Sequence, residues 1–202
     1  MGDAIDAEVE GLVKGDQVEK AATRSFEVYG AEIYGFLVSF MSSETAASDV
    51  FSQVSEDLWA GLPKFMFKSS LRTWLYVLAR NAAARYRRSP WNKKERRGNE
   101  SRIESLAEAV RSGTQPWQRT EIKDGFRTLR ESLDPDDRIL LTLRIDRDLA
   151  WEEVARVMLD SEGEVDPAVL SRETDRLRKR FQLLKTELRK RAQDAGLLDV
   201  TR

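Results

Sequence analysis

Cysteine and histidine are both absent from the 202-residue sequence. Without cysteine the chain can form no disulfide and offers no thiolate nucleophile, and without either residue it lacks the usual ligands of a zinc site. The absence of histidine also removes the most common general base of enzymes. We therefore expect no metal, no cofactor and no catalytic activity, although carboxylates remain available for acid-base chemistry.

Prolines and long apolar runs are scarce as well. The chain has five prolines and no run of about 18 apolar residues of the kind that crosses a membrane. Its first six residues are acidic and lack the basic-then-apolar order of a secretory signal. The sequence therefore predicts a cytoplasmic protein with no insertion into a membrane.

Charge is abundant but unevenly distributed. The formal net charge is only −1, yet residues 1–60 hold 12 acidic and 3 basic residues. Residues 72–97 hold 9 basic residues and 1 acidic residue, and residues 172–191 hold 9 basic and 3 acidic residues. Binding to a polyanion depends on where basic patches lie rather than on the total charge. The two basic segments are thus candidate nucleic-acid surfaces, unless they are simply solvated helix faces.

Apolar residues recur at intervals of three and four through most of the chain, which predicts an all-α protein with two small helical domains. Residues 1–20 show little periodicity and predict an acidic N-terminal tail, either loose or a frayed first helix. Residues 21–90 form the first expected domain, and residues 117–198 form the second. Residues 91–116 contain Gly98, Gly113 and Pro116 and a weaker pattern, and they predict a flexible linker.

Four helix starts carry recognisable caps. Ser42 or Ser43 can accept a backbone hydrogen bond at one start, and Ser69 or Ser70 at the next. Asp134-Pro135 and Asp166-Pro167 place a capping carboxylate before a proline that suits the first helical position. These caps mark the N-terminal ends of the helices that matter for function.

The helix that follows Ser70 has a specific sequence. Ser69-Ser70-Leu71-Arg72-Thr73-Trp74-Leu75-Tyr76 continues through Ala79-Arg80-Asn81. This run resembles region 2 of the sigma-70 family of RNA polymerase sigma factors, most closely the extracytoplasmic-function group, nearly residue by residue. The resemblance extends over residues 28–88.

The resemblance implies two binding surfaces in the first domain. One is the helix from Glu44 to Trp59, which would bind the beta-prime clamp of core RNA polymerase; the implied contacts are Asp49, Val50, Gln53 and Asp57. Ser52, Gln53 and Ser55 depart from the residues that the family usually has there. The other surface would bind the opened −10 element of promoter DNA, where a base is flipped out. The implied contacts there are Phe65, Lys68, Arg72, Trp74, Tyr76, Arg80, Asn81, Arg87 and Arg88.

Chemistry supports that second surface, because guanidinium groups pair with phosphates and aromatic rings stack on unpaired bases. A competing interpretation makes Trp74 a core residue with a solvated basic face beside it. Phe65 and Phe67 can likewise be hydrophobic anchors rather than base contacts.

The second periodic block, residues 117–195, resembles region 4 of the same group, a helix-turn-helix. Leu133 to Arg138, Leu149 to Ala155 and Arg176 to Phe181 carry this resemblance. It implies that the last helix reads the −35 element through Ser171, Arg172, Arg176, Arg178 and Lys179. Two departures stand out: Ala150 replaces the usual capping serine, and the turn at residues 160–165 is longer and more acidic than usual.

The resemblance predicts a sigma factor that binds core RNA polymerase and directs transcription from −10 and −35 elements. Factors of this group are often held inactive by an anti-sigma factor, and no residue here identifies one. The alternative is a helix-turn-helix regulator that never binds polymerase, for which the helix from Glu44 to Trp59 would have no use. A helical carboxylate enzyme has no support, because the sequence shows no phosphate-binding loop and no nucleophile paired with a base.

Overall fold

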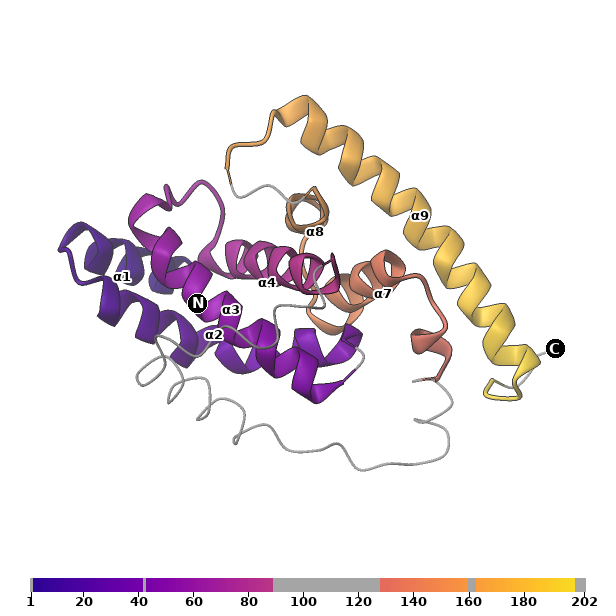
Figure 1. Ribbon diagram of the computed structural model, residues 1–202. Helices are drawn as coiled ribbons and strands as arrows, with labels where there is room; N and C mark the ends of the chain where they lie inside the picture. Colours follow the sequence, from indigo (N-terminus) through magenta and orange to yellow (C-terminus); the bar gives the residue numbers. More distant parts are fainter. Residues whose placement is uncertain (1, 42, 89–127, 160–162, 199–202) are drawn as a thin grey trace. The chain divides into compact units, whose positions relative to one another are not determined.

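The computed structural model describes residues 2–41, 43–88, 128–159 and 163–198. Every regular element in these ranges is a helix, so the predicted all-α class is confirmed. The chain divides into two compact units, residues 1–115 with 160–164 and residues 116–159 with 165–202 (Figure 1). The predicted linker at 91–116 lies outside the described residues.

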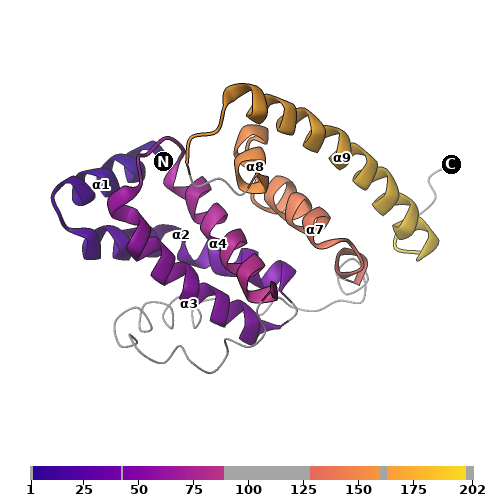
Figure 2. The same ribbon diagram turned by 45° about the horizontal axis from the view of Figure 1, so that its top comes forward.

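Four helices build the first unit: α1 (Gly2–Lys14), α2 (Val18–Phe40), α3 (Glu44–Gly61) and α4 (Leu71–Arg88). A short 3-10 turn, η1 (Leu62–Lys64), follows α3. Helix α2 packs against α1, α3 and α4, and α3 also packs against α4 (Figure 2). The apolar stripe of α2 therefore supplies the centre of the core, with Ile33, Phe36 and Leu37 fully buried.

Serine caps begin two of these helices, as predicted. The Ser43 hydroxyl accepts a hydrogen bond from the Ala46 N–H at 3.1 Å. The Ser70 hydroxyl accepts one from the Thr73 N–H, also at 3.1 Å. Each bond satisfies a backbone donor that has no partner inside its own helix.

The N-terminal segment forms the helix α1, so of the two alternatives that its sequence left open, a loose tail or a first helix, the structure shows the helix. Two apolar residues of α1, Ile5 and Val9, are buried in the first unit. Asp6 lies on the same helix and accepts a hydrogen bond from the Leu71 N–H at 3.2 Å. Burial raises the pKa of Asp6, although the bond from Leu71 acts in the opposite direction. Helix α1 is thus joined to the start of α4.

The described part of the second unit contains α7 (Pro135–Leu141), the π-helical turn η3 (Thr142–Asp146), α8 (Trp151–Met158) and α9 (Pro167–Asp194). Helices α7 and α8 both pack against α9 (Figure 2). The Trp151 ring meets the Phe181 ring edge-on, with 5.4 Å between their centroids. A small apolar core therefore holds the long α9 against the two shorter helices.

The predicted aspartate caps of this unit are confirmed. The Asp134 carboxylate accepts from the Asp136 N–H at 3.0 Å, and Asp166 accepts from Ala168 and Val169. Ala150 cannot cap α8 with its side chain, but Glu153 accepts from the Ala150 N–H at 2.9 Å. The missing serine is therefore replaced by half of a capping box. Across the described ranges, no helix combines the length and apolarity needed to cross a membrane.

Candidate functional site

One face of α3 carries three of the four residues predicted to bind polymerase. Asp49, Gln53 and Asp57 are four residues apart, so they stand in a line on one side of the helix. The Gln53 side-chain amide donates to Asp57 Oδ1 at 2.9 Å, which links two members of the line. Val50, the fourth, is 1% exposed and belongs to the core. In this conformation a partner can reach the line but not the side chain of Val50.

Helix α4 reaches this line from one side. The Arg85 guanidinium forms an ion pair with Asp57, and the Tyr86 hydroxyl donates to Asp49 Oδ2 at 3.4 Å. Cations and hydroxyls from α4 thus border the carboxylates of α3. We call the line of Asp49, Gln53 and Asp57, which Arg85 of α4 borders, the α3 face.

The loop before α4 is organised by a stack of aromatic rings. Phe65 lies parallel to Trp74, with 4.2 Å between centroids and 8° between planes, and Phe67 contacts Phe65. Trp74 is 3% exposed and rests on Gly61, where an added Cβ would come within 2.8 Å of the indole. Trp74 is therefore a core residue in this structure. Its burial does not support the base contact that was predicted for it.

The same loop also presents exposed and strained residues. Met66 is 71% exposed, and Lys68 is exposed beside it. Phe67 has φ of 51°, a left-handed conformation that a bulky residue rarely adopts. The sequence analysis did not single out Met66 as a site residue. Its position as an apolar residue between Phe65 and Phe67 was the signal that could have identified it.

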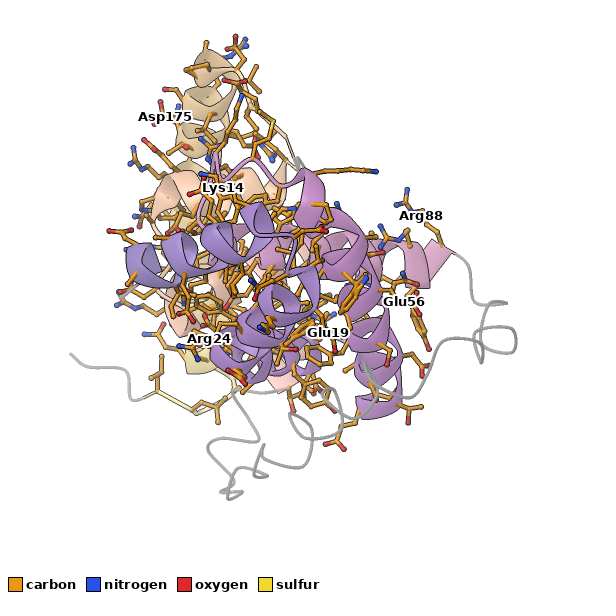
Figure 3. The ribbon with its side chains drawn as sticks, turned by 90° about the vertical axis from the view of Figure 1, so that its left-hand side faces the viewer. Lys14, Glu19, Arg24, Glu56, Arg88 and Asp175 are labelled. Carbon is orange, nitrogen blue, oxygen red and sulfur yellow. The ribbon has the colours of Figure 1, made fainter. Side chains whose placement is uncertain are left out.

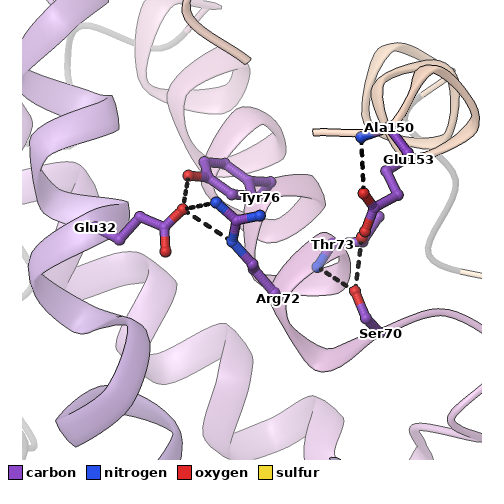
Figure 4. A network of polar contacts seen from close by, with 7 residues as sticks. All are labelled: Glu32, Ser70, Arg72, Thr73, Tyr76, Ala150 and Glu153. Carbon is purple, nitrogen blue, oxygen red and sulfur yellow. Dashed lines mark hydrogen bonds and ion pairs between the residues drawn. The ribbon is translucent and has the colours of Figure 1, made fainter. Parts of the chain in front are cut away.

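A half-buried acid on α2 organises the first turns of α4. Glu32 of α2 accepts hydrogen bonds from the Arg72 guanidinium, with Nε at 2.9 Å, and from the Tyr76 hydroxyl at 2.6 Å (Figure 4). Tyr76 is fully buried and meets Phe36 edge-on at 5.0 Å between centroids. Arg72 and Tyr76, both predicted to bind DNA, thus hold α4 to α2, and burial leaves Tyr76 out of reach of a partner. Glu32 escaped the sequence analysis.

The far end of α4 is where exposed cations gather. Arg80 and Asn81 are half-buried, whereas Arg85, Arg87 and Arg88 are exposed. The Arg87 guanidinium lies 5.3 Å from the centre of the Phe40 ring. Arg88 projects from the end of the helix (Figure 3). Positive charge at a helix C-terminus is favoured by the helix dipole, and here it also creates an accessible basic surface.

The outer face of α9 carries every residue predicted for the −35 element. Leu170, Thr174, Leu177 and Phe181 are buried against α7 and α8. The predicted residues are all exposed: Ser171, Arg172, Arg176, Arg178 and Lys179. Because Asp166 caps the helix just upstream, the first two turns of this face are well ordered for contact with a groove.

Two of those arginines are paired with acids of the same helix. Arg176 donates to Glu173 through both Nε (2.8 Å) and Nη2 (2.6 Å), and this bond raises the pKa of Arg176. Arg178 makes one longer contact, 3.4 Å, with Asp175, which projects from α9 in Figure 3. Arg180 instead joins α9 to Asp137 of α7 at 2.5 Å. Glu173 is a further residue that sequence reasoning missed.

Comparison with known proteins identifies the first unit. Residues 26–93, which include most of α2 and all of α3 and α4, match the family described as Sigma-70 region 2. The chain is also similar to the RNA polymerase sigma-H factor of Pseudomonas aeruginosa, with 28% identity over 153 residues. That similarity covers 71% of this chain and 79% of the relative.

The matched segment contains both the α3 face and the basic helix α4. The similarity to the Pseudomonas protein reaches well beyond this segment, because it covers more than twice as many residues. The chain therefore contains a segment that matches Sigma-70 region 2, and most of its length is similar to an RNA polymerase sigma factor.

Proposed function

We propose that this chain is a sigma factor of the extracytoplasmic-function group, which binds core RNA polymerase and directs it to promoters. The first unit would act as region 2 and bind the beta-prime clamp and the −10 element. The second unit would act as region 4 and read the −35 element. A protein with this role works in the cytoplasm and contributes no catalytic chemistry of its own, since the polymerase supplies it.

The observation that carries this proposal is the pairing of two surfaces inside the segment that matches region 2. The α3 face presents Asp49, Gln53 and Asp57 in an accessible line, and α4 ends in three exposed arginines. A regulator that only binds DNA would need the basic surface but not the α3 face. The sigma-factor role accounts for both, so the alternative of a polymerase-independent regulator is not favoured.

Binding to core polymerase tests the proposal most directly. We expect the full chain to co-purify with core enzyme, and replacement of Asp49 and Gln53 by alanine together to weaken the complex by at least about tenfold, or about 1.4 kcal/mol. Asp148→Ala is the matched control, because this acid is 89% exposed and lies in the second unit. Failure of the full chain to bind core enzyme would refute the sigma-factor role.

A second test separates the two DNA surfaces. Arg80 and Asn81 are proposed to act where the duplex opens, and Arg172 to act on intact duplex at −35. A promoter mismatched at the −10 element needs no strand opening, so it should largely rescue Arg80→Ala and Asn81→Ala. It should not rescue Arg172→Ala, which we expect to cost about 1–3 kcal/mol of promoter binding. Equal rescue of both classes would refute this division of roles.

An anti-sigma factor is a further proposed partner, implied by the group alone. The free protein is expected to bind duplex DNA weakly, because residues 1–60 carry a large excess of acids that repel phosphates. Tight, sequence-specific binding of the full chain to duplex DNA without polymerase would contradict that expectation.

A further inference from the structure

Glu173 lies within one of the two basic stretches of the chain, on the helix proposed to enter a DNA groove. A carboxylate there repels the phosphates of DNA, so its presence calls for a physical reason. Its side chain is only 12% exposed, whereas that of Arg176, one turn further along α9, is 58% exposed. A mostly buried acid therefore stands behind an exposed arginine.

The contact between them is bidentate. Arg176 Nε donates to one Glu173 oxygen at 2.8 Å, and Arg176 Nη2 donates to the other at 2.6 Å. Among the described residues, Arg176 makes no other hydrogen bond or ion pair, and neither does Glu173. Asp136 of α7 is the other acid near enough to act on the Arg176 charge. One edge of the guanidinium is thus fixed by Glu173.

The opposite end of the guanidinium is left for a ligand. A guanidinium has five N–H groups, and the bidentate contact uses one on Nε and one on Nη2. Three donors remain, and one on Nη1 together with the one on Nη2 forms a second pair, directed away from Glu173. Such a pair matches the O6 and N7 acceptors that guanine presents in the major groove. The geometry therefore leaves Arg176 with the donor set that guanine recognition requires.

We propose that Glu173 is a positioning residue that holds Arg176 for the recognition of one guanine in the −35 element. This inference rests on the proposed role of α9 in promoter binding. Because Glu173 is mostly buried, the arginine is ordered before DNA arrives, and less conformational entropy is lost on binding. The carboxylate keeps its distance from the phosphates because it sits on the inner side of the arginine.

A second pair on the same helix provides an internal comparison. Arg178 meets Asp175 through one contact of 3.4 Å, and both side chains are more than half exposed, at 53% and 64%. An exposed pair of this kind contributes little order, because solvent competes for both partners. Asp175 therefore serves as the matched control for Glu173: the same charge, on the same helix, without the bidentate geometry.

The experiment measures promoter preference with the full chain bound to core polymerase. Each −35 position is changed in turn to all four bases, and open-complex formation is compared for wild type and variants. Arg176→Ala should reduce the preference for guanine at one position, by roughly fivefold to 150-fold. Glu173→Ala should reduce the preference at that same position, and the double variant should be no worse than Arg176→Ala. Glu173→Gln, which keeps one acceptor, should retain part of the preference.

Several results would overturn the inference. One is a Glu173→Ala variant that changes binding to all promoters equally, as the simple loss of a negative charge would and as we expect of Asp175→Ala. Another is an Arg176→Ala variant with no position-specific effect. Thermal unfolding of each variant identifies losses that come from misfolding. If Glu173→Ala is misfolded, the base preference of Glu173→Gln at the same −35 position supports or overturns the inference. If the wild-type chain fails to initiate transcription at all, the proposed function fails, and this inference fails with it.

Discussion

The two basic helices, α4 and α9, differ in how far they are buried and in where the partners of their cations lie. Ten of the 18 residues of α4 are buried, against six of the 28 residues of α9. Arg72 and Arg85 of α4 pair with acids on other helices, Glu32 and Asp57. On the outer face of α9, Arg176 and Arg178 pair instead with Glu173 and Asp175 of the same helix. Substitutions in α4 should therefore disturb the fold as well as binding, and those on the outer face of α9 should disturb binding alone.

The strongest test of this contrast is Tyr76→Ala in α4. The side chain is fully buried and packs on Phe36, so its loss should lower the free energy of unfolding by about 3–5 kcal/mol. Urea denaturation followed by circular dichroism measures the change. Tyr76→Phe removes only the hydroxyl bond to Glu32 and should cost about 0.5–1.5 kcal/mol. A near-neutral Tyr76→Ala would mean that α4 is not the core element described.

Gly61 gives the next largest expected effect. A methyl group at this position would come within 2.8 Å of the Trp74 ring, which is itself stacked on Phe65. Gly61→Ala should therefore destabilise the first unit by about 1–3 kcal/mol through overpacking. Gly11→Ala is a control of opposite sign, because nothing lies within 4 Å of it and the change should stabilise α1 by about 0.5–1 kcal/mol. Equal effects of the two variants in thermal unfolding would contradict the close contact.

Asp6 tests whether α4 depends on a distant helix for its first turn. Asp6→Ala should cost about 0.5–2 kcal/mol, the usual contribution of a capping acceptor, whereas Asp6→Asn keeps an acceptor and should cost less. Burial raises the pKa of Asp6 in the folded state, so the wild type should lose stability relative to Asp6→Asn as the pH rises from about 3.8 through that raised value. Urea titrations between pH 3 and 6 measure the difference. If the stability of the wild type relative to Asp6→Asn instead increases with pH, the pKa of Asp6 is not raised in the folded state.

The smallest effect is expected on α9. Asp175→Ala removes an exposed carboxylate with one long contact, and it should change the free energy of unfolding by less than about 0.5 kcal/mol. Differential scanning calorimetry of the full chain is the measurement. A loss as large as that of Asp6→Ala would show that local pairs on α9 stabilise the fold, and the contrast with α4 would disappear.

The sequence predicted those parts of this molecule that depend on local chemistry. Caps such as Ser43, Asp134 and Asp166 act within three residues, so the pattern alone located them. The exposed basic faces of α4 and α9 followed from helical periodicity in the same way.

Contacts between distant residues were beyond such reasoning. Glu32 stands in an apolar stripe of α2, and only the packing of α2 on α4 explains it, because its partners lie 40 and 44 residues away. Asp6 is comparable, with its partner 65 residues away. Burial of Val50, Trp74 and Tyr76 likewise depends on which helices meet, so a family motif cannot separate contact residues from core residues.

The bond from Leu71 to Asp6 also has a consequence for how this protein is made. Asp6 leaves the ribosome 65 residues ahead of its partner. At ordinary speeds of synthesis, about 5–20 residues per second, this interval lasts roughly 3–13 s. During that time α1 can pack on α2, its main partner, but it lacks the contact with the start of α4. The first unit can therefore complete its fold only late in its own synthesis, after the start of α4 has emerged and can bond to Asp6 of α1.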